Sequence, residues 1–345
     1  MAAKKKATKK TTPVERSRDA GLATKRAKRS LPEFQPPPND HLSAAFIKNK
    51  MIPPSLRGTD EFLDIVTWNI RFFHNRDRKR VDRIVDILAG LNADIIVLQE
   101  IENLAMDVVA DELRRVEAGF YKTAYGTTGG DQRVCMLYDL DFIRAKDDIT
   151  ELFGKGTILS DDGKDAFPRL PLRGYFVGLT SEDPFDFQLL GLHLKSQRGG
   201  GDSQRVRSAQ ALREWLETTG TREDSDVIMI GDWNAPPSAD PWEPLRELEA
   251  TRAVKFQSIN NESEISHLMY KSKNNLGSRL DLNLISMSAS EKMKEPPKVV
   301  RWEPLEKFIE GNPRAAAIKE FLAAVREDVS DHLPVVTRFF FTDNS

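Results

Sequence analysis

Cysteine is almost absent from this sequence: Cys135 is the only one in 345 residues, so no disulfide can form within the chain. That scarcity fits a reducing compartment, although a secreted protein with one cysteine is also compatible with it. No stretch offers the roughly 18 uninterrupted apolar residues of a membrane span, and residues 1–30 lack the roughly 7–15 apolar residues of a secretory signal. We therefore expect an intracellular protein, cytoplasmic or associated with the nucleoid or nucleus, with Cys135 as a buried core side chain.

Excess charge of one sign is also missing from the whole chain, whose formal net charge is −2. The distribution is uneven, however. Residues 1–30 carry seven Lys and four Arg against two acidic residues, a net of +9, which leaves −11 on residues 31–345. Such a polar segment cannot bury a core, so we predict a disordered basic tail over residues 1–30. The tail can contact polyanions through their phosphates, or it can be a solubilising or targeting extension; both interpretations stay open.

A proline-rich segment follows the tail. The prolines at residues 36–38 and 53–54 predict an extended linker over residues 31–58. The folded domain is predicted over residues 59–342, with no internal boundary visible. Residues 288–328 are its least regular part, although the pattern over residues 314–326 predicts a helix.

Apolar runs of the predicted domain repeatedly end in a polar side chain. A core built only for packing has no use for such groups, because each buried polar group without a partner costs about 1–3 kcal/mol. A shared cation and phosphate would supply the partners. The polar residues at or just after these runs are Asn69, Glu100, His193, Asp232, Asn234, Asp281, Asp331 and His332.

Two stretches share one plan, in which an apolar strand, an amphipathic helix and a second apolar strand follow each other. They cover residues 66–98 and 187–230. Because such units deliver polar groups at the carboxyl ends of their strands, we expect those ends to meet at one crevice. Further strands are predicted over residues 133–138, 175–180, 280–285 and 335–341.

This ordered set of residues resembles the endonuclease/exonuclease/phosphatase superfamily, which includes pancreatic-type deoxyribonucleases, abasic-site endonucleases, inositol-polyphosphate phosphatases and sphingomyelinases. The resemblance covers about residues 60–342. It implies an α/β fold, a four-layer sandwich of two packed mixed β-sheets flanked by helices. It also implies a single catalytic domain.

The resemblance implies a divalent metal, Mg²⁺ or Mn²⁺, held chiefly by Glu100. Ionising Glu100 unpaired after an apolar run would be costly, and a cation is the natural counter-charge; a surface salt bridge is the alternative. Asp331 is the second ligand candidate. Asn69 is placed near the same ion or the substrate phosphate, although by itself it is equally typical of a turn.

The resemblance also implies the catalytic roles. Asp232 orients or activates the attacking water, and Asn234 holds the phosphate. His332 exchanges a proton and is paired with Asp281, which fixes its tautomer. His193 contacts the scissile phosphate or protonates the leaving oxygen, with Asp131 as the expected supporting acid. Ser330 is expected only to position its neighbours, and the remaining histidines, His41, His74 and His267, are expected to be ordinary residues.

Substrate contacts are predicted for Lys195, which would stabilise developing negative charge or else be plain surface. Arg198, Arg205 and Arg207 surround the glycines at 199–201 and form a basic loop beside His193, so we expect phosphate-backbone contacts there.

The favoured function is a metal-dependent phosphodiesterase, a nuclease that hydrolyses DNA or RNA by in-line attack of an activated water. The alternative is a phosphatase or phosphodiesterase acting on a phosphoinositide, a phospholipid or a nucleotide, which the acidic body favours. A non-catalytic nucleic-acid-binding protein is the third hypothesis. Retention of the metal-binding and proton-handling residue types argues against it.

Overall fold

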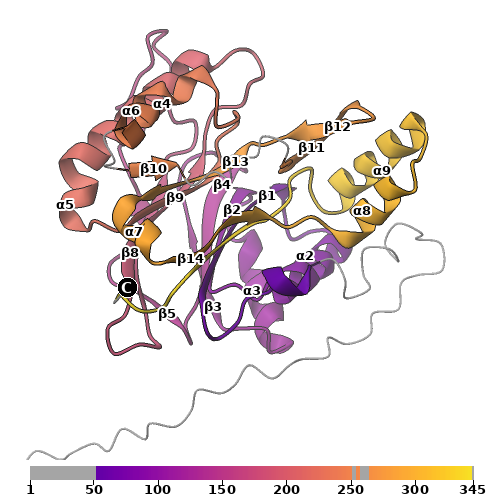
Figure 1. Ribbon diagram of the computed structural model, residues 1–345, viewed down its shortest axis with the longest axis horizontal. Coiled ribbons are helices and arrows are strands. Elements are labelled where there is room, and N and C mark those ends of the chain that lie inside the picture. Colours follow the sequence, from indigo (N-terminus) through magenta and orange to yellow (C-terminus); the bar gives the residue numbers. More distant parts are fainter. Residues whose placement is uncertain (1–51, 251–253, 257–263, 344–345) are drawn as a thin grey trace, which may run out of the picture. The chain divides into compact units, whose positions relative to one another are not determined.

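The computed structural model describes residues 52–250, 254–256 and 264–343 (Figure 1). The predicted tail, His41 and most of the predicted linker lie outside the described residues. The end of that linker is not extended as expected: Pro54–Leu56 forms a 3₁₀ turn, η1, and Ile52 is buried in the core. None of the helices in the described ranges is both long and apolar enough to cross a bilayer.

Two large mixed sheets form the centre of the fold (Figure 1). The first is six-stranded, in the order β14 (Met293–Val299), β15 (Val335–Phe339), β1 (Leu63–Phe73), β2 (Ile95–Ile101), β4 (Arg133–Asp139) and β3 (Tyr121–Tyr125). The second is seven-stranded, in the order β10 (Val254–Phe256), β13 (Asp281–Ser286), β9 (Val227–Asp232), β8 (Asp186–His193), β7 (Leu172–Gly178) and β5 (Ile143–Ala145), with β6 (Thr150–Glu151) also paired to β7. β11 (His267–Ser272) and β12 (Asn275–Ser278) form a separate hairpin.

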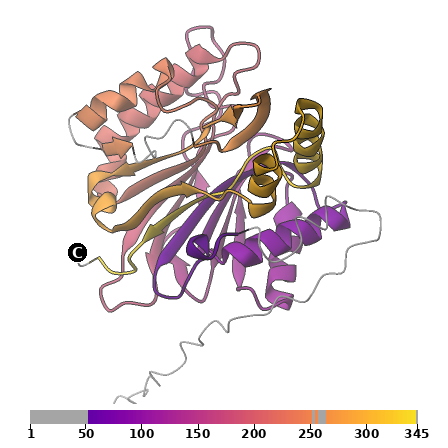
Figure 2. The ribbon, with the colours of Figure 1, turned by 45° about the vertical axis from the view of Figure 1, so that its right-hand side comes forward.

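Helices cover the outer side of each sheet (Figure 2). Those that pack on the first sheet are α2 (Arg78–Leu91), α3 (Ala105–Arg115), α8 (Glu303–Glu310) and α9 (Ala315–Asp328). The second sheet is covered by α4 (Asp202–Trp215), η3 (Asp240–Trp242) and α6 (Glu243–Ala250), with the turns η2 (Leu216–Gly220) and α5 (Thr221–Glu223) after α4 and the short α7 (Met287–Glu291) after β13. The predicted four-layer α/β sandwich is confirmed.

Alternation along the strands creates the core between the sheets. In β1, Leu63 and Ile65 face the second sheet, while Val66 and Trp68 pack in the cluster of α2 and α9. In β9, Ile228 and Ile230 face inward in the same way. Because side chains alternate with a period of two, the next inward positions are the polar ends of these strands. The interior between the sheets is therefore largely apolar and becomes polar where these strands end, although Asn283 of β13 also donates to Thr337 of β15 within it.

Both predicted strand–helix–strand units are present. β1 pairs with β2 in parallel through α2, and β8 pairs with β9 in parallel through α4. The sequence did not reveal β14, which carries two consecutive prolines. It lies at the edge of the first sheet with register shifts, the setting in which a sheet tolerates proline.

Candidate active site

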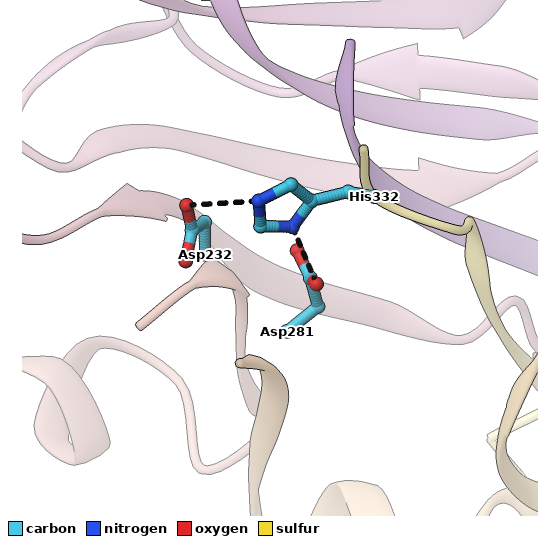
Figure 3. A group of neighbouring side chains, drawn as sticks. All are labelled: Asp232, Asp281 and His332. Carbon is cyan, nitrogen blue, oxygen red and sulfur yellow. Dashed lines mark hydrogen bonds and ion pairs between the residues drawn. The ribbon is translucent and has the colours of Figure 1, made fainter. Parts of the chain in front are cut away.

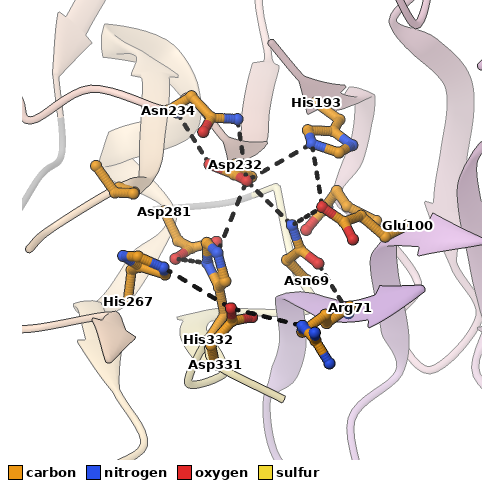
Figure 4. A network of polar contacts seen from close by, with 12 residues as sticks. Asn69, Arg71, Glu100, His193, Asp232, Asn234, His267, Asp281, Asp331 and His332 are labelled. Atoms are coloured by element: carbon orange, nitrogen blue, oxygen red, sulfur yellow. Dashed lines mark hydrogen bonds and ion pairs between the residues drawn. The ribbon is translucent and has the colours of Figure 1, made fainter. Parts of the chain in front are cut away.

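Three polar side chains form one row across the inner face of the second sheet. His193 of β8 lies opposite Asp232 of β9, and Asp232 lies opposite Asp281 of β13. Gly231 makes the close β8–β9 approach possible: it has φ 150°, and a Cβ there would lie 2.0 Å from the carbonyl oxygen of Leu192. The three side chains are buried: His193 and Asp232 end β8 and β9, and Asp281 begins the antiparallel β13 (Figure 4).

The first sheet contributes Asn69 and Glu100 to the same place (Figure 4). Asn69 Nδ2 donates to Asp232 Oδ2 at 3.0 Å and lies 3.4 Å from Glu100 Oε1. Glu100 has φ 63° and sits where the β2–β4 register shifts. Such a bulge re-aims a side chain, and here it directs Glu100 toward the site while Ile101 packs in the outer core.

His332 and Asp281 form a buried dyad (Figure 3). The Nδ1 atom of His332 lies 2.8 Å from Asp281 Oδ2, and its Nε2 lies 3.9 Å from Asp232 Oδ2. Burial by itself lowers the pKa of His332, but the carboxylates of Asp281 and Asp232 outweigh it and raise that pKa to about 10. Burial raises the pKa of Asp232 to about 7, against the charge of His332.

These three residues offer ligand atoms within 4.8 Å of one another, so they could also hold a metal ion.

A segment outside the predicted motifs braces this dyad. Ser266 is fully buried, and its hydroxyl oxygen accepts from the backbone nitrogens of Leu280 and Asp281, both at 3.0 Å. Its carbonyl accepts from Leu333 N at 2.7 Å. Ser266 therefore connects the start of β13 to the loop that carries His332.

His267, expected to be an ordinary residue, lies in the site. Its ring centre is 4.7 Å from that of His332, and its Nε2 is 4.0 Å from Asp331 (Figure 4). Burial and then the charge of His332 lower the pKa of His267 to about 4. His267 is therefore neutral at physiological pH. It reaches the site only through its folded contact with His332, so the sequence pattern did not single it out.

His193 is neutral for a similar reason. Burial, followed by the charges of Arg169 and His332, lowers its pKa well below the ordinary value. Its Nε2 lies 3.7 Å from Asp232 and 3.9 Å from Glu100. The expected support from Asp131 is wrong: Asp131 is exposed, and Nδ1 of His193 has no hydrogen-bond partner among the described residues.

These groups open into a pocket of about 450 Å³. Besides the predicted His193, Asp232 and Asn234, its lining includes Gln132 and Arg169, which the sequence analysis missed. Arg169 lies in a loop with no periodic pattern that would single it out. Burial lowers its pKa while the carboxylates of Asp232 and Glu100 act in the opposite direction. As an arginine it remains a cation, and its Nη2 donates to the Leu194 carbonyl at 3.4 Å.

Asn234 and Ser330 have local roles at the site. The Nδ2 atom of Asn234 donates to Asp232 Oδ2 at 3.1 Å and to the carbonyl of Leu194 at 3.0 Å. Ser330 Oγ donates to the carbonyl of Asn69 at 2.6 Å and accepts from His332 N at 3.0 Å. Ser330 thus positions its neighbours, the role expected for it.

The basic loop offers fewer side chains for phosphate contacts than expected. Arg198 lines the pocket, but Lys195 Nζ donates to the carbonyls of Ser196 and Arg198, both at 3.1 Å. Arg205 is buried, pairs with Asp202 on its own helix and donates to the Lys195 carbonyl, so it is structural rather than a phosphate contact. Arg207 pairs with Glu214 along α4.

The donor set fits a divalent cation. Glu100 and Asp232 both approach His193 Nε2 with carboxylate oxygens, and oxygen is the ligand that Mg²⁺ and Mn²⁺ prefer. Asn69 presents its amide nitrogen to these acids, while its oxygen accepts from Arg71 N at 2.9 Å. Asp331 faces Arg71, Arg326 and His267 at 3.7–4.0 Å. The ligand roles of Asn69 and Asp331 therefore stay predictions.

The sequence comparison agrees with this arrangement. The Endonuclease/Exonuclease/phosphatase family model matches residues 66–247, a range that includes Asn69, Glu100, His193, Asp232 and Asn234. The chain belongs to this family. No curated protein matches the sequence.

Solved structures similar to this family member share its fold. An endonuclease/exonuclease/phosphatase family protein from Bacteroides thetaiotaomicron has a TM-score of 0.53 and 15% identity, covering 81% of this chain and 98% of that one. A functionally unknown conserved protein from Enterococcus faecalis V583 gives 0.52 and 15%, covering 80% and 98%. The human Nocturnin catalytic domain with bound sulfate gives 0.51 and 16%, covering 82% and 95%.

Proposed function

We propose that this chain is a metal-dependent phosphodiesterase that acts as a nuclease on DNA or RNA. The observation that carries the proposal is the convergence of Glu100 from one sheet with His193 and Asp232 from the other, beside the His332–Asp281 dyad and Arg169. Acids, a charged imidazole and a guanidinium around one pocket suit a phosphate ester whose charge rises during hydrolysis.

Glu100, with Asp331 and Asn69 as further candidates, would hold Mg²⁺ or Mn²⁺. When bound, the cation neutralises phosphate charge. The chain's own residues account for the proton. The carboxylates of Asp281 and Asp232 raise the pKa of His332, which suits it to stabilise phosphate charge as a cation, and burial raises the pKa of Asp232, which suits it to take a proton from the attacking water.

The groups around Asp232 would bind the phosphate. Arg169 and the charged His332 would attract the phosphate oxygens, and Asn234, which also lines the pocket, donates to Asp232. His193 Nε2 faces the carboxylates of Glu100 and Asp232, and the neutral ring with its proton on this nitrogen can donate to a phosphate oxygen. As the water oxygen bonds to phosphorus, the bond to the leaving oxygen breaks in line.

The test is a substrate panel with plasmid, single-stranded DNA, RNA, an inositol phosphate and sphingomyelin, each with Mg²⁺, Mn²⁺ or excess EDTA. We expect nucleic-acid cleavage with either metal and none with EDTA. Asp232→Asn should reduce the rate on the order of 10²–10⁴-fold, and the matched exposed variant Asp161→Asn should leave it unchanged.

Two results would contradict the proposal in different ways. Full activity in EDTA would remove the metal requirement. Turnover of the inositol phosphate or sphingomyelin without nucleic-acid cleavage would instead favour the phosphatase alternative, which the net charge of −11 on residues 31–345 supports.

A further inference from the structure

An exposed aromatic ring lines the polar pocket. Phe72 follows the β1 residues of the site and is 51% exposed, although it is a large apolar side chain. Single exposed apolar residues are common on protein surfaces. Phe72 differs because it lines the pocket that holds Glu100, Asp232 and His332.

The backbone holds Phe72 in this place under strain. Arg71 and Phe72 have φ values of 42° and 46°, a left-handed region that residues other than glycine seldom occupy. Two groups fix the conformation: Phe72 N donates to Glu100 Oε2 at 3.1 Å, and the buried Arg80 donates to the carbonyls of residues 70–72 and of Val329. Strain that the surroundings maintain in this way is typical of functional sites.

The charges around the ring indicate what it would contact. The guanidinium of Arg71 lies 5.7 Å from the Phe72 ring centre, and Arg198 and Arg326 line the same pocket. Cations interleaved with an aromatic ring are the elements by which proteins bind the backbone and bases of single-stranded nucleic acid. The acidic body disfavours a long duplex footprint, which needs an extended positive face.

We propose that Phe72 is a stacking platform for an unpaired nucleobase beside the scissile phosphate, so that the chain prefers single-stranded nucleic acid to duplex. The proposal rests on the nuclease function proposed above. In a duplex each base already stacks on its neighbours, so only an unpaired base can use the ring. Loss of one base–aromatic stack weakens binding roughly 5- to 150-fold.

The test compares three substrates of one length: a single-stranded oligonucleotide, its blunt duplex, and a single strand whose bases are replaced by abasic sites. Phe72→Ala should raise KM for the single strand roughly 5- to 150-fold and leave KM for the abasic strand near that of the wild type. Phe72→Trp should retain the single-strand preference. Phe120→Ala is the matched control, because Phe120 is also exposed, at 38%, with the Arg114 guanidinium 4.3 Å from its ring centre.

Binding measured by fluorescence anisotropy in EDTA separates this inference from the nuclease proposal. If Phe72→Ala weakens binding of the single strand but not of the abasic strand, the result supports the stacking proposal. It does so even if the wild type cleaves no substrate and the nuclease proposal fails. The stacking proposal is overturned if the variant binds and cleaves all three substrates like the wild type. It is also overturned if the variant loses affinity for the single strand and the abasic strand equally.

Discussion

Protonation of His332 depends on two opposing effects, its burial and the carboxylates of Asp281 and Asp232. Because the pKa is raised above the ordinary value of 6.5 to about 10, the folded protein binds this proton more tightly than the unfolded chain does. The resulting stability is fully present below about pH 6.5 and is lost as the pH rises through about 10.

Replacement of Asp281 by Asn should lower the pKa of His332, because burial then acts against fewer negative charges. Histidine NMR on the metal-free protein measures this directly. We also expect the alkaline limb of the pH–rate profile to move to lower pH, since the proposed mechanism uses the protonated imidazole. Asp161→Asn, at an exposed position, is the control. An unchanged His332 titration in Asp281→Asn would show that the dyad does not set this pKa.

Gly231 is required by the contact between β8 and β9. Gly231→Ala should cost more than about 3 kcal/mol or prevent folding, because its Cβ would overlap the Leu192 carbonyl 2.0 Å away. Gly163→Ala is the matched variant: its φ is 74°, but no described residue lies within 4 Å of the added atom. That change should cost about 1–2 kcal/mol from backbone conformation alone. If urea unfolding shows the same loss in the free energy of unfolding for Gly231→Ala and Gly163→Ala, the overlap with the Leu192 carbonyl does not explain the cost.

Ser266 stabilises the junction between β13 and the His332 loop. Ser266→Ala leaves two buried backbone N–H groups without their acceptor, which should cost about 1–3 kcal/mol. Because the Asp281–His332 geometry loosens, kcat should fall and the alkaline limb should move to lower pH, with KM little changed. Ser266→Thr should restore both. Ser290→Ala, which removes only a helix hydroxyl bonded to Met287, should leave the pH profile unaltered.

Periodicity in the sequence predicted the strands and the residues at their ends, because local patterning determines which face of a strand is buried. It did not predict side chains that reach the pocket through tertiary contacts. Arg169 comes from a loop, His267 is placed by pairing with the His332 segment, and Asp131 points elsewhere. The sequence also did not predict the β2 bulge that re-aims Glu100, because no residue pattern marks a glutamate that adopts a positive φ.

Because acids cluster around the pocket, the proposed metal site predicts that a divalent cation stabilises the whole domain. At 100 times its Kd, Mg²⁺ or Mn²⁺ should add about 2.7 kcal/mol to the free energy of unfolding, a rise in Tm of several degrees. Glu100→Gln should abolish most of this rise, while Glu102→Gln, which only loses a surface pair with Arg76, should keep it. A metal-induced shift that survives in Glu100→Gln would place the ion elsewhere.

Charge asymmetry predicts a separate role for residues 1–30, which lie outside the described residues. Deletion of this segment should weaken DNA binding and reduce its salt dependence, because fewer phosphate counterions are released. Turnover of a small diester should be unchanged. Reduced diester turnover would instead indicate that the tail takes part in the reaction.

The chain passes from the first sheet to the second and later returns to the first, which has a consequence for proteolysis. The exposed turn at residues 161–164 follows β5 and β6, which belong to the second sheet, and precedes β14 and β15, which return to the first. A protease nick in this turn would therefore yield two interleaved fragments, each holding strands of both sheets. The nicked molecule should migrate as one particle and separate only when denatured, and neither fragment expressed alone should reconstitute the pocket.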